Sequence, residues 1–106
     1  MLFRSPERSG QSQLALRAYP NPVRHSIVHF ELAGLAQVEG IRVQVFTVSG
    51  ELVWSGEASG RILDWEPRAK DGGRLARGPY VYCMHRLIQG AWTKAGCAIL
   101  FLAEND

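Results

Sequence analysis

A polar, glycine-rich stretch between two apolar runs is the feature that most constrains the fold of this chain. The first run ends at Trp65, the polar stretch contains Asp71-Gly72-Gly73, and a tyrosine-rich run begins at Tyr80. We interpret this pattern as a strand, a long corner and a second strand. A two-layer sandwich needs such a corner to carry the chain from one sheet to the other, with bulky aromatic side chains covering the core at each end.

Alternating apolar and polar side chains predict that most of the chain is β-strand. In the clearest case, Ile41, Val43 and Val45 alternate with the polar residues Arg42 and Gln44. The same reasoning predicts strands at residues 14–19, 26–32, 41–47, 52–55, 61–65, 80–87 and 92–102. Seven short strands separated by turn residues predict an all-β chain, an immunoglobulin-like β-sandwich of about seven antiparallel strands.

Length and composition predict a single domain. The chain has 106 residues and 46% hydrophobic content, enough for one core. Residues 1–13 are polar without a period and are expected to be a tail or linker, residues 14–103 to be the sandwich, and residues 104–106 to be a short tail. The core is expected to include six apolar side chains: Val28, Phe30, Val43, Val45, Trp65 and Tyr80.

The last predicted strand is apolar on both faces, which exceeds what a sandwich needs. Residues 97–103 are consecutive apolar residues, so the face turned away from the core also needs cover. Either the chain itself covers that face, or alternate members such as Leu100 and Leu102 form a docking patch. Under the second hypothesis, Leu100→Glu would disturb association more than folding. The candidate interaction residues are Trp54, Trp92, Ile99, Leu100, Phe101 and Leu102.

Two cysteines lie on the strands of the predicted final hairpin. A three-residue loop at residues 89–91 would set Cys83 opposite Cys97, close enough for a disulfide. A two-residue loop would offset them by one and turn their side chains to opposite faces. Because cysteine is often buried as a plain apolar group, we favour two free buried thiols over a bond.

Charge and residue spacing argue against several function classes. The net charge is only +2 and the arginines are scattered, so no nucleic-acid partner is expected. The histidines at 25, 29 and 85 lack ligand spacing, and Asp64 and Glu66 are interpreted as exposed acids. We therefore expect no cofactor, no metal and no enzymatic activity.

The order of several short motifs resembles a known family. The motifs are Tyr19-Pro20-Asn21-Pro22, Val28-His29-Phe30-Glu31-Leu32, the run from Ile41 to Val53, and Trp65 leading through Asp71-Gly72-Gly73 to Ala76-Arg77-Gly78-Pro79-Tyr80. Together they resemble the immunoglobulin-like domain shared by flagellar hook-capping proteins and the C-terminal sorting domains of type IX secretion substrates. The resemblance covers about residues 14–102. Glu66 and Pro67 replace the family's usual Asp-Gly pair, and Ala69 replaces a frequent aspartate, which puts a cation site at that loop in doubt.

The resemblance implies a non-catalytic interaction, anchoring or secretion-sorting module of an exported or cell-surface bacterial protein. Its partner would be a protein of the secretion or surface-assembly machinery, or a neighbouring domain or subunit, bound through open strand edges and the apolar last strand. The alternatives are a structural subunit or cap-like piece of an extracellular assembly, and a carbohydrate-binding accessory module, for which Trp54 and Trp92 would have to lie coplanar on an exposed face.

The start of the chain bears on localisation. No stretch is long and apolar enough to span a membrane, and the residues after Met1 lack the apolar centre of a signal peptide. We expect an extracellular or cell-surface location if a signal precedes this sequence, and a cytoplasmic one if the chain is a complete product.

Overall fold

The protein is an all-β sandwich, as the sequence predicts. A computed structural model describes residues 14–24, 27–69 and 71–103, and these contain seven strands and no helix. The two predicted tails, residues 1–13 and 104–106, lie outside the described residues. The strands are β1 (Ala15–Tyr19), β2 (Val28–Ala33), β3 (Gly40–Thr47), β4 (Leu52–Ser59), β5 (Ile62–Trp65), β6 (Gly78–Ile88) and β7 (Ala91–Leu102).

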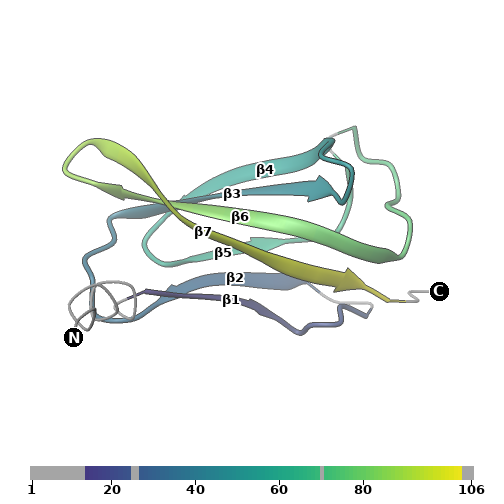
Figure 1. The fold of residues 1–106 in the computed structure, drawn as a ribbon, viewed down its shortest axis with the longest axis horizontal. Helices are drawn as coiled ribbons and strands as arrows, with labels where there is room; N and C mark the ends of the chain where they lie inside the picture. The colour runs from purple at the N-terminus through teal and green to yellow at the C-terminus, as the bar shows by residue number, and fades with distance from the viewer. Residues whose placement is uncertain (1–13, 25–26, 70, 104–106) are drawn as a thin grey trace, which may run out of the picture.

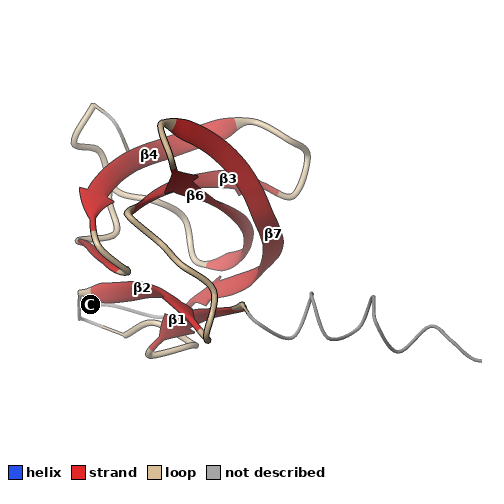
Figure 2. Ribbon diagram, turned by 90° about the vertical axis from the view of Figure 1, so that its left-hand side faces the viewer, coloured by secondary structure: helices blue, strands red, loops and turns tan. Residues whose placement is uncertain are grey.

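Two antiparallel sheets face each other across the core. One sheet has the order β1-β2-β5 and the other the order β4-β3-β6-β7 (Figure 1). Viewed from the end, the four-stranded sheet curves over the three-stranded one and brings β7 down beside β1 (Figure 2). A constant-type immunoglobulin domain keeps its fourth strand in the sheet of its first strand, whereas here β4 pairs with β3.

The core lies between the sheets and takes its buried side chains from β2, β3, β5, β6 and β7, together with Val23 after β1. The fully or nearly fully buried side chains are Val23, Val28, Phe30, Leu32, Ile41, Val43, Val45, Trp65, Tyr80, Tyr82, Met84, Leu100 and Leu102. All six side chains that the sequence assigned to the core are in this set. Apolar residues at every second position have one face to bury, and the two sheets bury these faces against each other.

The corner between β5 and β6 is held by the two aromatic residues that flank it. The Trp65 indole Nε1 donates a hydrogen bond to the Arg68 carbonyl oxygen at 3.2 Å. The Tyr80 hydroxyl donates to the Ala76 carbonyl oxygen at 2.6 Å, as in the tyrosine corner of immunoglobulin-type sandwiches. A tyrosine hydroxyl is protonated at neutral pH, and burial raises the pKa of Tyr80 further above its usual value. Each ring therefore fills the core while its polar atom is satisfied.

Strand β4 is longer than the sequence predicts. The sequence predicts a short strand that ends at residue 55, but its pairing with β3 continues to Gly40↔Ser59. Gly56 lies inside the strand because the Trp54 indole occupies the space that a side chain would need. A Cβ atom at Gly56 would lie 2.7 Å from Trp54 Cζ2. Pairing with β3 therefore outweighs the low strand propensity of this segment.

Candidate interaction surface

An apolar stripe runs across one end of the outer face of the four-stranded sheet. We define the apolar stripe as Phe46 of β3, Val81 of β6, and Ile99 and Phe101 of β7. Phe46 pairs with Val81, which in turn pairs with Ile99, so three neighbouring strands contribute side chains to it. Ile99 and Phe101 expose 47% and 48% of their surface. Two half-exposed large apolar side chains beside further apolar neighbours are typical of an interaction surface.

The stripe contains Ile99 and Phe101, whereas the sequence pointed to the alternate residues Leu100 and Leu102 as the docking patch. Leu100 and Leu102 are 0% and 7% exposed, so they belong to the core and cannot form a docking patch on the folded domain. The prediction that Leu100→Glu would affect association more than folding is therefore wrong. Ile99 and Phe101 were among the candidates and do face outward. Phe46 and Val81 were missed, although the alternation of β3 and β6 already placed them on the outer face.

A β-bulge in β7 decides which of the two sets faces inward. The turn at Gln89-Gly90 has two residues, and the strands leave it with Ile88 opposite Ala91. The register then shifts between Met84 and His85, so that Ala95 has no partner on β6. One extra residue in one strand reverses the facing of every residue beyond it. Beyond the bulge, Tyr80 is opposite Leu100, and both point into the core.

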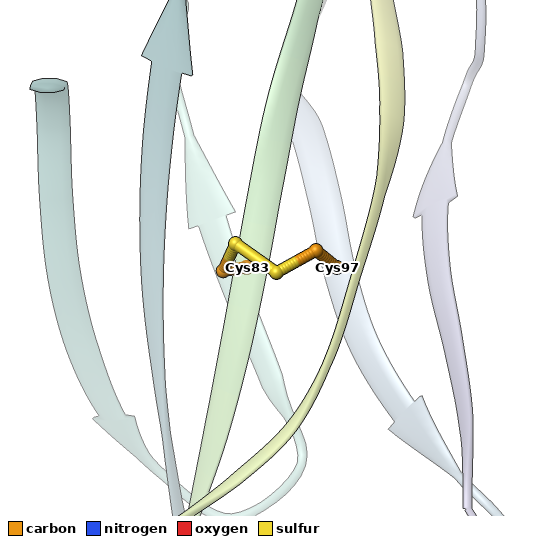
Figure 3. The surroundings of a disulfide bond; sticks show 2 residues. All are labelled: Cys83 and Cys97. Atoms are coloured by element: carbon orange, nitrogen blue, oxygen red, sulfur yellow. A yellow bond between two sulfur atoms is a disulfide. The ribbon is translucent and has the colours of Figure 1, made fainter. Parts of the chain in front are cut away.

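A disulfide joins β6 and β7 beside the stripe, and this corrects our preference for two free buried thiols. Cys83 and Cys97 are directly opposite each other and are bonded, with their Cα atoms 4.0 Å apart (Figure 3). Cys97 is exposed and Cys83 is half-buried, because both lie on the outer face of the sheet. The loop has two residues, which alone would have separated the thiols. The bulge at Ala95 supplies the missing residue and brings them together.

The other end of the same face is polar. Arg42 Nε donates to Glu57 Oε2 at 2.8 Å, and the Arg42 guanidinium lies 4.3 Å from the centre of the Trp92 ring. His85 sits between Arg42 and Lys94 on the adjoining strands. Burial, with further contributions from these two cations, lowers the pKa of His85 below its usual value. Its Nδ1 atom is buried and has no hydrogen-bond partner among the described residues.

The two tryptophans considered for carbohydrate binding lie on opposite faces of the sheet. Trp54 pairs with the core residue Val45 and stacks on Trp65, with ring centres 4.9 Å apart. Trp92 faces outward and packs on Arg42. They therefore form no coplanar platform, and the criterion that we set for a carbohydrate-binding module is not met. Trp54 instead helps to line an open hollow of about 320 Å³ together with Ser55, Trp65, Glu66, Arg68 and Ala69.

The edge of β7 is partly covered by the segment that follows β1. The Asn21 side chain donates from Nδ2 to the Ile99 carbonyl oxygen at 3.1 Å and accepts from the Phe101 amide at 3.0 Å. Val23 continues this cover with a parallel bridge to Leu102, accepting from Ala103 and donating to Phe101. This end of β7 is therefore closed to strand addition, contrary to the expectation that the edges are open. On the other side of the sheet, β4 has β3 as its only strand neighbour in the described part of the chain.

The remaining polar candidates are engaged in local contacts. His29 Nδ1 lies 2.7 Å from Asp64 Oδ1 on the outer face of the three-stranded sheet, and Glu66 Oε2 accepts from Arg68 Nε at 3.4 Å. His25 lies outside the described residues. Within residues 14–24, 27–69 and 71–103, no group of three or more His, Cys, Asp or Glu side chains is placed to hold a metal ion. The same residues contain no helix that is long and apolar enough to cross a membrane.

Comparison with known proteins identifies the fold. No protein-family model and no curated protein sequence matches the chain. Among solved structures, dimeric latent PorU from Porphyromonas gingivalis matches with a TM-score of 0.70 and 19% identity, over 85% of this chain and 9% of PorU. PorZ, an essential surface component of the type IX secretion system of the same bacterium, matches with a TM-score of 0.62 and 20% identity, over 85% of this chain and 12% of PorZ.

A third similar structure comes from a different kind of protein. The polysaccharide deacetylase BC0361 of Bacillus cereus matches with a TM-score of 0.66 and 11% identity, over 87% of this chain and 31% of the deacetylase. At these identities the likeness shows the fold alone. The chain spans less than a third of each of these three proteins, and in each the likeness is to a part about the size of one domain.

Proposed function

We propose that this chain is a non-catalytic interaction and sorting module of an exported or cell-surface bacterial protein. The observation that carries the proposal is the apolar stripe on the outer face of the four-stranded sheet, where Ile99 and Phe101 are half-exposed. A partner protein that covers these side chains would remove apolar surface from water. This contributes about 25 cal/mol for each Å² buried.

Two further observations support this proposal. Disulfides persist in the periplasm and outside the cell and are rare in the cytosol, so the Cys83–Cys97 bond favours an exported location. The motif resemblance to sorting domains of type IX secretion substrates agrees with the likeness in fold to PorZ, a surface component of that system. We therefore propose the type IX secretion or surface-assembly machinery as the source of the partner.

A secretion assay tests the proposal. Residues 1–106 would be fused to the C-terminus of a reporter with a signal peptide, in a bacterium that has a type IX system, and the reporter measured at the cell surface and in the periplasm. We expect delivery to the surface, and its loss in a strain that lacks the secretion machinery. A reporter that stays in the periplasm of both strains would contradict the proposal.

A matched pair of variants separates the stripe from the rest of the surface. Ile99 and Ile62 are the same residue type with nearly equal exposure, 47% and 48%, but Ile62 lies on the three-stranded sheet. We expect Ile99→Glu to reduce delivery at least ten-fold and Ile62→Glu to leave it near the parent value. Equal losses in the two variants, with both folded by circular dichroism, would show that the stripe has no special role.

A further inference from the structure

The sequence of β7 is compatible with two registers against β6. The sum of the two residue numbers in a pair identifies the register. Next to the turn, Leu87 pairs with Trp92 and the sum is 179. Beyond the bulge, Tyr80 pairs with Leu100 and the sum is 180. Without the bulge, Tyr80 would instead be opposite Ile99, because 80 and 99 also sum to 179. The inward set would then be Ile99 and Phe101 in place of Leu100 and Leu102.

Side-chain burial discriminates weakly between these registers. Both inward sets consist of large apolar residues, and burying any one of them contributes about 1.5–3 kcal/mol. Asn21 contacts only backbone atoms of Ile99 and Phe101. In the other register, the residues one position earlier in β7 could therefore make the same hydrogen bonds. The bulge interrupts the hydrogen-bond ladder at Ala95, which opposes the observed register. Gly96, next to Ala95, has a φ of +151°, a conformation that glycine adopts readily, and so accommodates the bulge. The disulfide adds a covalent link that favours the same register.

The disulfide can form in only one of the two registers. In the observed register Cys83 is opposite Cys97, and both side chains lie on the outer face of the sheet. In the register without a bulge, Cys83 would be opposite Gly96 and Cys97 opposite Tyr82, because each pair sums to 179. Since Tyr82 points into the core, the two sulfur atoms would lie on opposite faces of the sheet.

We propose that the Cys83–Cys97 bond selects the bulged register of β7, so that oxidation determines which side chains complete the apolar stripe. In the reduced chain, Ala98 would take the place of Ile99 opposite Val81, and Leu100 would take the place of Phe101 opposite Pro79. The stripe with Ile99 and Phe101 is then formed only where the chain meets an oxidant. This inference concerns the fold of one hairpin and does not depend on the proposed function.

The oxidising step is an exchange with a second disulfide. The two cysteine thiols lose two protons and two electrons as the Cys83–Cys97 bond forms, and the disulfide of a thiol oxidoreductase takes them up and leaves as a dithiol. In the reduced register Cys83 stays on the outer face of the sheet, between the buried residues Tyr82 and Met84, and is the thiol that such an oxidant can reach. Cys97 then closes the bond as β7 takes the bulged register.

Nuclear magnetic resonance spectroscopy can distinguish the two registers directly. In the oxidised protein, the Cα atoms of Cys83 and Cys97 are 4.0 Å apart, the close spacing at which facing Hα atoms give a strong nuclear Overhauser effect. In the Cys83→Ser/Cys97→Ser variant we expect the contact between positions 83 and 97 to be lost. A contact between position 83 and Gly96 should replace it. Retention of the contact between positions 83 and 97 in this variant would overturn the proposal.

Deletion of Ala95 provides the matched control. Without this residue, the register set by the turn places positions 83 and 97 opposite each other with no bulge, so no bond is needed to select it. In the double serine background, we expect the deletion to restore the contact between positions 83 and 97. If the double serine chain loses its structure to the same extent with and without Ala95, the bond acts on stability alone and the proposal is wrong.

Discussion

Strands β3 and β7 lie in the same sheet, yet they are determined in different ways. In β3, the apolar residues Ile41, Val43 and Val45 are all 0% exposed and alternate with Arg42 and Gln44 on the outer face. In β7, residues 97–102 are apolar on both faces, so the sequence supplies no polar residue that must face water. The outer set is nevertheless half-exposed and the inner set is buried.

The difference shows how polar residues on the outer face of a strand fix its register. A slip of one residue in β3 would bury the Arg42 guanidinium without a counter-charge, at a cost of several kcal/mol, so its facing is fixed by its own residues. The same slip in β7 exchanges one apolar set for another. Its facing is set by the bulge at Ala95 and by the disulfide to β6.

Truncation of the two faces of β7 should have very different effects on stability. Leu100→Ala removes a fully buried side chain and is expected to lower the free energy of unfolding by about 2–5 kcal/mol. Ile99→Ala changes a half-exposed neighbour and is expected to cost about 1 kcal/mol or less. Urea unfolding followed by tryptophan fluorescence measures both. Equal costs would show that the two faces of β7 are not distinct.

Reduction of the disulfide should destabilise the domain through β7. The bond joins residues 14 apart, and a loop of about 15 residues contributes about 3 kcal/mol when it is closed. We expect the urea midpoint to fall on addition of a phosphine reductant and to be restored by reoxidation. The Cys83→Ser/Cys97→Ser variant is the control, since reductant should leave its midpoint unchanged. A parent midpoint that does not respond to reductant would contradict this account.

Loss of the Asn21 side chain should loosen the covered edge of β7 without affecting β3. Asn21→Ala removes two hydrogen bonds to the backbone and is expected to cost about 1–2 kcal/mol. Asn21→Asp keeps the acceptor for the Phe101 amide and loses the donor to the Ile99 carbonyl, so its effect should be intermediate. Hydrogen exchange at the Phe101 amide measures the local effect. Unchanged protection of this amide in the alanine variant would refute the proposed role of Asn21.

The smallest expected effect is a pH dependence at the polar end of the outer face. The pKa of His85 in the folded protein is below its unfolded value of about 6.5, so the unfolded chain binds more protons as the pH falls through this value. Stability is therefore expected to decrease below about pH 6.5. His85→Gln should weaken this dependence, which paired melting curves at pH 5 and pH 8 can measure. A variant with the same pH dependence as the parent would exclude His85 as its source.

Much of the fold was predictable because its signals are local. The corner was read from Trp65, the glycine-rich loop and Tyr80, and the structure buries both rings there. The limits of β4 were not predictable, since Gly56 looks like a strand end until Trp54 is seen to occupy its side-chain space. The stripe was predicted in part. Ile99 and Phe101 were candidates, but Leu100 and Leu102 were preferred because the bulge at Ala95 was not recognised, although Gly96, a glycine inside the strand with a φ of +151°, is a sequence signal for it.

By itself, the sequence determined a two-sheet sandwich, the core face of each strand that has polar residues on its other face, and the aromatic corner. Each of these follows from a period of two or from turn residues at known positions, which are properties of neighbouring residues. Only the tertiary structure decided which face of β7 is exposed and that Cys83 and Cys97 are bonded. Both depend on the single unpaired residue Ala95, and whether a residue is left unpaired is settled by the neighbouring strand and not by the chain's own alternation.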